Sequence, residues 1–242
     1  MTKFFDVSVI ICTIGRPELV RRAVASVDKA AAKCNLSIQL IVVFDGCSVI
    51  DLDCAVPNII LRNEKRLGLS AGRNSGVDVA SGRYISFLDD DDLFLPSRFK
   101  KVERTIIEGD VKFIALDSLI FDVSLNKFSG KIISHEVQDK TSFLLSMPIA
   151  NSSTWICSSS IFDCFRFSEI IRRGVDGDLL SYIVLNGVPV STPRVFGTIY
   201  RVGHQYNRIT SNNFKSMVHA ITGDLIILVR YSRVSPLALT FS

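Results

Sequence analysis

The hydrophobic positions of the first fifty residues form two continuous runs with a helical stripe between them. The β-branched runs at 7–12 and 38–44 predict strands that are buried on both faces of a parallel sheet. Between them, Pro17 opens a segment whose apolar residues recur three or four positions apart, which predicts a helix. Strand, helix and strand in this order form a βαβ unit, so we expect the two strands to be parallel with a right-handed crossover.

A short apolar run at 59–61 predicts a third strand, and a glycine-containing helix follows it. Ser70 is the predicted N-cap of this helix, which should end near Ala80. Gly72 and Gly76 lie four residues apart on one face, where they would permit close approach of another backbone. Their spacing matches neither a P-loop nor a dinucleotide-binding turn, so the sequence supports neither of these phosphate-binding folds.

Beyond about residue 110 the regular alternation of strand and helix is lost. The segments predicted there are a strand at 111–121, a hairpin tip at 125–131, a helix at 141–147, a short strand at 154–157, a helix from 172 to 186 and an amphipathic helix at 214–231. No stretch rich in Gly, Pro or Ser separates the two halves. We therefore predict a single domain over residues 1–242, with a regular α/β half (1–109) and a mixed half (110–242).

Four consecutive carboxylates, Asp89 to Asp92, follow an apolar strand that begins near Tyr84, and Pro96 stops its extension. In an extended chain Asp89 and Asp91 project to one side, where they could share Mg²⁺ or Mn²⁺. Neighbouring anions repel by roughly 1 kcal/mol per pair even in water, so a cation is expected there. The alternative is a solvated loop in which Asp92 caps a short helix at 93–99. Ligands of open α/β sheets bind at strand carboxyl ends, which favours a ligand site.

The overall charge and the absence of long apolar runs exclude several classes of protein. The net charge is +4 and the basic residues are scattered, so no nucleic-acid partner is indicated. No apolar run reaches the 18 or so residues of a transmembrane helix, and no signal peptide is evident. We expect a cytoplasmic protein with free thiols, because the six cysteines include no CxxC pair. An alternative role for the amphipathic helix at 214–231 is peripheral association with the inner face of the membrane.

Four motifs in this order resemble the family 2 glycosyltransferases of the GT-A fold. They are the opening strand and turn at 7–17, the Phe44-Asp45-Gly46 tripeptide in which Phe44 replaces an Asp, Asn63 together with 68–74, and the DxD strand at 84–96. The resemblance implies a Rossmann-like, mostly parallel sheet flanked by helices, with a nucleotide-sugar-binding half at 1–109. The acceptor-binding half at 110–242 would be mixed in structure.

The same resemblance implies a role for individual side chains. It places Thr13, Arg16 and Asp45 in the nucleotide base pocket, Arg73 on the nucleotide or its diphosphate, Asp89 and Asp90 on the nucleotide, Asp91 and His204 on Mn²⁺ or Mg²⁺, and Asp176 as the general base. Asp176 belongs to a segment, 174–179, that resembles the Gly-Glu-Asp helix start of the family, with Val175 at the usual Glu.

The predicted function is inverting transfer of a sugar from a nucleotide-diphosphate sugar, with UDP the commonest choice in the family, to a hydroxyl of a glycan or lipid-linked acceptor in surface polysaccharide synthesis. A sugar-phosphate nucleotidyltransferase would carry a glycine-rich loop after its first strand, and a haloacid-dehalogenase phosphatase would carry its DxD on that strand. Neither feature is present. A non-catalytic nucleotide-sugar-binding or partner subunit remains the alternative, because Val175 replaces the Glu.

Overall fold

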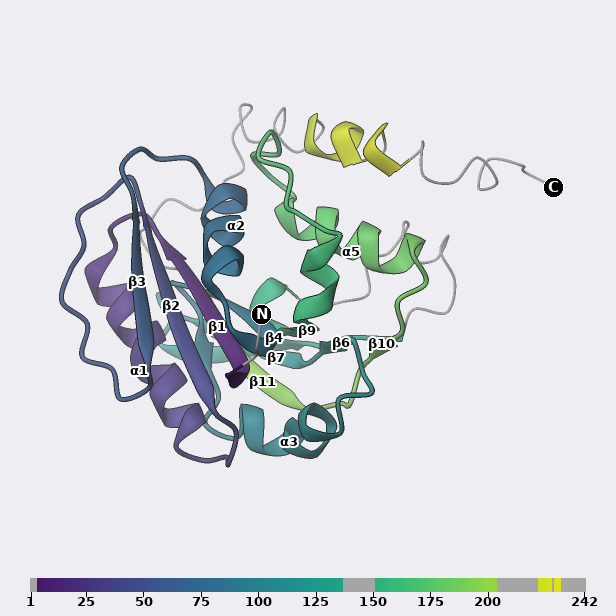
Figure 1. The fold of residues 1–242 in the computed structure, drawn as a ribbon. Coiled ribbons are helices and arrows are strands. Elements are labelled where there is room, and N and C mark those ends of the chain that lie inside the picture. The colour runs from purple at the N-terminus through teal and green to yellow at the C-terminus, as the bar shows by residue number, and fades with distance from the viewer. Residues whose placement is uncertain (1–3, 137–150, 204–221, 228, 232–242) are drawn as a thin grey trace.

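The computed structural model describes residues 4–136, 151–203, 222–227 and 229–231. The helix predicted at 141–147 and the candidate ligand His204 lie outside these residues. The described chain contains a seven-stranded sheet and a four-stranded sheet, with helices on both faces of the larger one (Figure 1). This confirms the predicted α/β class.

The larger sheet has the strand order β10-β6-β9-β4-β1-β2-β3. Its strands are β1 (Phe5–Thr13), β2 (Ile38–Asp45), β3 (Asn58–Asn63), β4 (Gly82–Asp89), β6 (Phe113–Ala115), β9 (Trp155–Ser158) and β10 (Val190–Ser191). β1 pairs in parallel with both β2 and β4, and β2 with β3, so these four strands end at one edge of the sheet. β9 is antiparallel to both of its neighbours, β4 and β6.

Alternate residues of β1 point to opposite faces of this sheet and belong to two separate cores. Val9 packs with α1 (Pro17–Ala31) and α3 (Arg98–Glu108), whereas Ile10 packs with α2 (Leu69–Val79) and α5 (Val175–Leu185). The continuous apolar sequence of β1 follows from this burial on both faces, since each of its side chains meets a helix layer.

The smaller sheet lies beside the end of β4 and has the order β5-β11-β7-β8. Its strands are β5 (Leu93–Phe94), β7 (Asp117–Asp122), β8 (Lys127–Ile132) and β11 (Phe196–Val202). The single strand predicted at 111–121 is therefore wrong: β6 and β7 belong to different sheets, separated only by Leu116. The helix at 93–99 that the alternative interpretation of the acidic run required does not form, because Leu93 and Phe94 pair with β11 and α3 begins at Arg98.

Helix α2 begins two residues earlier than predicted. Gly68, with φ of 104°, stands at the N-cap, so Ser70 lies inside the first turn and the predicted capping role is wrong. The packing role predicted for the two glycines is confirmed. A Cβ atom at Gly72 would lie 3.1 Å from Sγ of Cys12, and one at Gly76 would lie 2.5 Å from Cγ2 of Ile10.

We expect a Gly76→Ala variant to lower the free energy of unfolding by about 1 kcal/mol. Alanine gains about 1 kcal/mol in helix propensity, but overpacking against the buried Ile10 costs about 1–3 kcal/mol. Urea denaturation measures the difference. The matched control is Gly130→Ala on the exposed strand β8, where the nearest atom is 3.4 Å away and no loss is expected. Equal stability of the two variants would contradict the proposed close packing.

All six cysteines are unpaired, as expected, although Cys157 alone among them is buried. Residues 222–227 and 229–231 are helical, in agreement with the C-terminal part of the predicted amphipathic helix. Among the described residues, the structure contains no helix with the length and apolar character needed to cross a membrane.

Candidate active site

A cleft of about 580 Å³ opens at the carboxyl ends of β1, β2 and β4. Every site residue predicted from the sequence lines it, apart from His204, which the structure does not describe: Thr13, Arg16, Asp45, Arg73, Asp89, Asp90, Asp91 and Asp176. Strand ends of a parallel sheet converge at one edge, which explains why residues so far apart in sequence meet here. Asp176, the candidate general base, belongs to the other half of the chain and lies at the start of α5.

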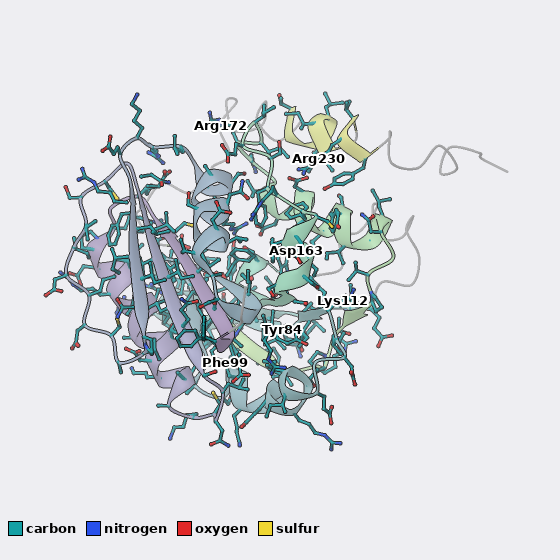
Figure 2. All side chains as sticks on the ribbon, in the orientation of Figure 1. Tyr84, Phe99, Lys112, Asp163, Arg172 and Arg230 are labelled. Atoms are coloured by element: carbon teal, nitrogen blue, oxygen red, sulfur yellow. The ribbon has the colours of Figure 1, made fainter. Side chains whose placement is uncertain are left out.

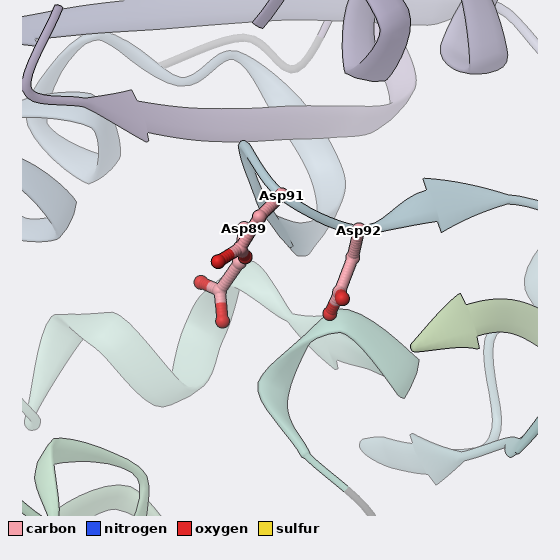
Figure 3. A group of neighbouring side chains, drawn as sticks. All are labelled: Asp89, Asp91 and Asp92. Carbon is pink, nitrogen blue, oxygen red and sulfur yellow. The ribbon is translucent and has the colours of Figure 1, made fainter. Parts of the chain in front are cut away.

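The acidic run is a tight turn rather than an extended strand. Its backbone bends after Asp89, whose carbonyl oxygen accepts a hydrogen bond from the Asp92 N–H at 3.0 Å. As a result, oxygens of Asp89, Asp91 and Asp92 lie within 4.8 Å of one another. Figure 3 shows the first two side chains projecting together and Asp92 lying apart from them. The predicted pairing of Asp89 with Asp91 is therefore present, and a third carboxylate stands next to it.

Asp92 stands behind the cleft and is not part of its lining. Its fully buried carboxylate accepts hydrogen bonds from Ser153 Oγ at 2.7 Å, Asn151 Nδ2 at 3.3 Å and the Arg201 N–H at 3.1 Å. Burial raises its pKa well above the ordinary value, and the nearby charge of Asp89 adds to this. We infer that Asp92 ties the acidic turn to the segment before β9 and to β11, and so fixes its shape.

Asp89 and Asp91 face the cleft and offer the hard oxygen ligands that Mg²⁺ and Mn²⁺ prefer. Burial raises the pKa of Asp89, the charge of Arg73 lowers it, and the charges of Asp176, Asp91 and Asp90 raise it, which together bring the pKa to about 6. Such crowding of negative charge is costly for the bare protein, and a divalent cation would relieve it. The donor set therefore fits a divalent metal.

An Asp89→Asn variant should raise the thermal midpoint of the metal-free protein at pH 7.5 but not at pH 5. A carboxyl whose folded-state pKa is raised binds its proton more tightly in the folded state, so its contribution to stability falls as pH rises from about 4 to about 6. At pH 7.5 asparagine removes the half-buried anion, and at pH 5 the wild-type group is already mostly protonated. The control is the exposed Asp53→Asn. If the increase in thermal midpoint caused by Asp89→Asn became larger toward pH 5, that result would contradict the raised pKa of Asp89.

Asp90 points the other way, toward the turn between β1 and α1, as alternation of faces predicts. Its buried carboxylate accepts a hydrogen bond from Thr13 Oγ1 at 2.6 Å and forms an ion pair with Arg16. Arg16 also reaches Asp91, with 3.3 Å between Nη1 and Oδ2. Burial raises the pKa of Asp90, although Arg16 opposes the shift. Thr13, Arg16 and Asp90 thus form one wall of the cleft.

Asp45 forms the opposite wall by holding the loop before α2. One oxygen accepts the Leu67 N–H at 2.9 Å and the Asn63 side chain at 3.1 Å, and the other accepts the Gly68 N–H at 2.8 Å. Gly46 allows this loop to approach, because a Cβ atom there would lie 2.3 Å from the nitrogen of Arg66. The Asp-Gly pair at the end of β2 therefore places the turn at 67–68 on the cleft.

Arg73 connects the two chemical centres of the cleft. Its buried guanidinium pairs with Asp176 at 2.7 Å and with Asp89 at 3.2 Å, and it donates to Ser152 Oγ at 2.6 Å. It lies 5.2 Å from the ring centroid of Phe87 and 5.4 Å from that of Phe167. One fixed cation thus joins the carboxylate at the end of β4 to the carboxylate at the start of α5.

Asp176 is held from a second direction by the chain. Its Oδ2 atom accepts the Ser152 N–H at 3.2 Å, and its side chain keeps about a third of its surface exposed. The carboxylate is therefore oriented and yet open to the cleft. This combination is what a group that takes a proton from a substrate needs.

Sequence reasoning missed several residues of the site. The cleft is also lined by Asn151, Glu169, Arg172 and Tyr200, and Ser152 contacts both Arg73 and Asp176. Asn74, which belongs to a recognised motif, anchors the segment that carries Glu169. Its side chain bonds the N–H and the carbonyl oxygen of Phe167, both at 3.0 Å. Only the motif around Asn74 offered a signal, because the other residues come from the irregular second half.

Comparison with known proteins gives a consistent result. The sequence model described as "Glycosyl transferase family 2" matches residues 8–165, more than half of the chain. The chain is 27% identical to the uncharacterized glycosyltransferase YwdF of Bacillus subtilis, over 68% of this chain and 60% of that protein. It is 26% identical to the GalNAc(5)-diNAcBac-PP-undecaprenol beta-1,3-glucosyltransferase of Campylobacter jejuni, over 67% and 54%. With the succinoglycan biosynthesis protein ExoO of Rhizobium meliloti, identity is 27%, over 81% and 61%.

The chain spans between about half and three fifths of the length of these relatives. Among solved structures, S. aureus TarS 1-349 in complex with UDP-GlcNAc superposes with a TM-score of 0.65 at 16% identity, over 100% of this chain and 76% of that one. The superposition supports the GT-A fold. Together with the match over residues 8–165, these findings establish that the chain belongs to glycosyltransferase family 2.

Proposed function

We propose that the cleft is the active site of an inverting hexosyltransferase that uses a UDP-sugar donor and an acceptor hydroxyl. The observation that carries the proposal is the meeting of a carboxylate pair, Asp89 and Asp91, with an oriented carboxylate, Asp176, in one cleft. A sugar nucleotide needs a neutralised diphosphate on one side of the reacting carbon and a base on the other. The cleft offers groups for both tasks.

The donor would bind along the carboxyl ends of β1, β2 and β4. The walls formed by Thr13 and Asp45 would receive the nucleotide base, and Asp89 would lie near the ribose. Asp91, with Asp89, would hold Mn²⁺ or Mg²⁺. When bound, such an ion acts as a Lewis acid on the diphosphate leaving group. A solved structural neighbour, TarS, was crystallised with UDP-GlcNAc and with UDP, which supports a uridine nucleotide.

Asp176 would take the proton from the acceptor hydroxyl as that oxygen attacks the anomeric carbon. Hydrogen bonds from Arg73 and the Ser152 N–H hold the carboxylate in place at the cleft. Attack from the face opposite the diphosphate is a single displacement, so it inverts the anomeric centre. An NMR assignment of the product showing a retained anomeric configuration would refute this mechanism.

For the acceptor we propose a glycan or a lipid-linked glycan of surface polysaccharide synthesis. The relatives from Campylobacter jejuni and Rhizobium meliloti carry names that refer to an undecaprenol-linked glycan and to succinoglycan, which supports this class. A lipid-linked acceptor would bring the protein to the cytoplasmic face of a membrane by peripheral association.

Thermal unfolding against a panel of nucleoside diphosphates, each with and without Mn²⁺, tests the donor site. A ligand at 100 times its dissociation constant adds about 2.7 kcal/mol when it binds only the folded state. We expect UDP with Mn²⁺ to raise the midpoint and UDP alone to have a smaller effect. If no diphosphate raises it, the proposed donor site is wrong. Binding without any sugar transfer would instead favour the non-catalytic alternative, which the buried Val175 at the usual Glu position suggests.

A further inference from the structure

Asp178 is a fully buried carboxylate in the first turn of α5, two residues after Asp176, and the proposed reaction gives it no role. It does not line the cleft. Its Oδ2 atom accepts the Ser168 N–H at 2.8 Å and pairs with Arg230 Nη1 at 2.6 Å, and its Oδ1 atom lies 3.1 Å from the Tyr231 hydroxyl. Arg230 and Tyr231 belong to the C-terminal helical residues, which are yellow in Figure 1. Figure 2 labels the side chain of Arg230.

Further contacts fix the orientation of the Arg230 and Tyr231 side chains around Asp178. The second Arg230 nitrogen, Nη2, donates to the carbonyl oxygen of Arg166 at 2.8 Å, and the guanidinium lies 5.4 Å from the ring centroid of Phe165. The Tyr231 hydroxyl is also 3.0 Å from the main-chain oxygen of Asp178. Burial and the neighbouring Asp178 carboxylate raise the pKa of Tyr231, so the hydroxyl keeps its proton and donates. Three separate segments therefore meet at a single carboxylate.

The cluster lies directly behind the part of the chain that forms the cleft. Asp176 and Asp178 flank Gly177 in one helical turn, so any shift of that turn moves both carboxylates. Ser168, bonded to Asp178, precedes Glu169, which lines the cleft and bonds Asn74 on the opposite side at 3.1 Å. The first turn of α5 is thus held from inside by Arg73 and from outside by Arg230 and Tyr231.

An ion pair with a fully buried carboxylate is a poor way to gain stability, since the desolvation of Asp178 can exceed its attraction to the partly exposed Arg230. Apolar side chains would pack the C-terminal helical residues onto α5 without that penalty. Hydrogen bonds between charged groups also fix the relative orientation of the side chains that they join. Direction matters for a catalytic base, because a displacement of about 1 Å can reduce the rate roughly 10²-fold.

We propose that Asp178, Arg230 and Tyr231 form a positioning cluster that sets the direction of the Asp176 carboxylate in the cleft. This inference rests on the proposed function, because it assumes that Asp176 is the base. The three residues touch neither donor nor acceptor. They act on the reaction through the first turn of α5, so they should affect the rate of the chemical step and leave nucleotide binding intact.

The test compares the wild type with Tyr231→Phe, which removes one hydroxyl, and with the double variant Asp178→Asn/Arg230→Gln, which removes both charges together and leaves no unpaired ion. UDP release in the presence of Mn²⁺ is measured with UDP-glucose, UDP-galactose, UDP-GlcNAc and UDP-GalNAc. The dissociation constant of UDP with Mn²⁺ is measured by calorimetry. The matched control is Arg104→Gln/Glu108→Gln, which removes an exposed ion pair from α3.

We expect kcat to fall about tenfold or more in the double variant and by a smaller factor in Tyr231→Phe. KM for the donor and the dissociation constant of UDP should stay within twofold of the wild type, and the control should match the wild type throughout. Unchanged kcat in Tyr231→Phe, or a parallel loss of kcat and UDP affinity, would overturn the positioning role. If the double variant does not fold, Tyr231→Phe alone decides. Without an added acceptor, UDP release reports transfer of the sugar to water. A wild type that neither releases UDP nor binds UDP with Mn²⁺ would refute the proposed function itself, and the inference with it.

Discussion

An Asp176→Asn variant is expected to lose sugar transfer by a factor of 10²–10⁴ while binding the donor nucleotide as tightly as the wild type. General base catalysis typically contributes a factor of this size. Asparagine has almost the same shape and retains an oxygen that can accept the hydrogen bond from Arg73, so the geometry of the cleft should persist. What it cannot do is accept the proton of the acceptor hydroxyl. Steady-state transfer assays and calorimetry with UDP and Mn²⁺ measure the two quantities separately.

The matched control for this variant is Asp163→Asn, which neutralises an exposed aspartate outside the cleft. It should transfer sugar at the wild-type rate. Full activity of Asp176→Asn would remove Asp176 from the mechanism. A loss of nucleotide affinity equal to the loss of rate would show that the residue serves only to hold Arg73.

An Asp91→Ala variant should lose both the metal-dependent part of nucleotide binding and nearly all transfer activity. A metal ion that acts as a Lewis acid contributes several kcal/mol to transition-state stabilisation. At about 1.4 kcal/mol for each tenfold change, this corresponds to a fall in kcat of about 10³-fold. Asp91 faces the cleft beside Asp89, so its removal takes away half of the carboxylate pair. The increase in thermal midpoint caused by UDP should become independent of Mn²⁺.

Asp51→Ala provides the control, because Asp51 is exposed and lies outside the cleft. Removal of Asp91 also frees Arg16 from one of its two carboxylates. Arg16 keeps its ion pair with Asp90, so this wall of the cleft should persist. An Asp91→Ala protein that still responds to Mn²⁺ in the presence of UDP would show that the ion binds elsewhere.

The parallel strands and the residues at their ends could be predicted from the sequence. β1 and β2 are buried on both faces along most of their length, so each has a continuous apolar sequence that can be recognised locally. The rule that ligands bind at strand carboxyl ends then brings Thr13, Asp45 and Asp89 together without knowledge of any contact. The close packing of Gly76 on β1 followed from its place on the helix face.

The strands of the second half could not be predicted in the same way, because their arrangement depends on contacts between distant segments. β9 inserts antiparallel between β4 and β6, and this places Ser152 against Arg73 and Asp176. Nothing local distinguishes Ser152 from its neighbours in a run of small polar residues. The division at Leu116 is equally hidden, since β6 and β7 read as one apolar run until they join different sheets.

Two side chains make tertiary contacts that no local pattern reveals. In the alternative interpretation Asp92 would cap a helix, whereas in the structure its buried carboxylate accepts a hydrogen bond from the Arg201 N–H of β11. The family resemblance implies that Arg73 supports the nucleotide or its diphosphate, and that role stays a prediction. The structure adds three hydrogen bonds from Arg73, to Asp176, Asp89 and Ser152.

The most direct measurement is the anomalous diffraction of Mn²⁺ in a crystal soaked with UDP and MnCl₂. Our account predicts a single strong peak between the carboxylates of Asp89 and Asp91, with the diphosphate of UDP bound to the same ion. The uracil base should lie between the walls formed by Thr13 and Asp45. A manganese peak at another site, or UDP bound outside this cleft, would contradict the proposal that the acidic turn is the donor site of a glycosyltransferase.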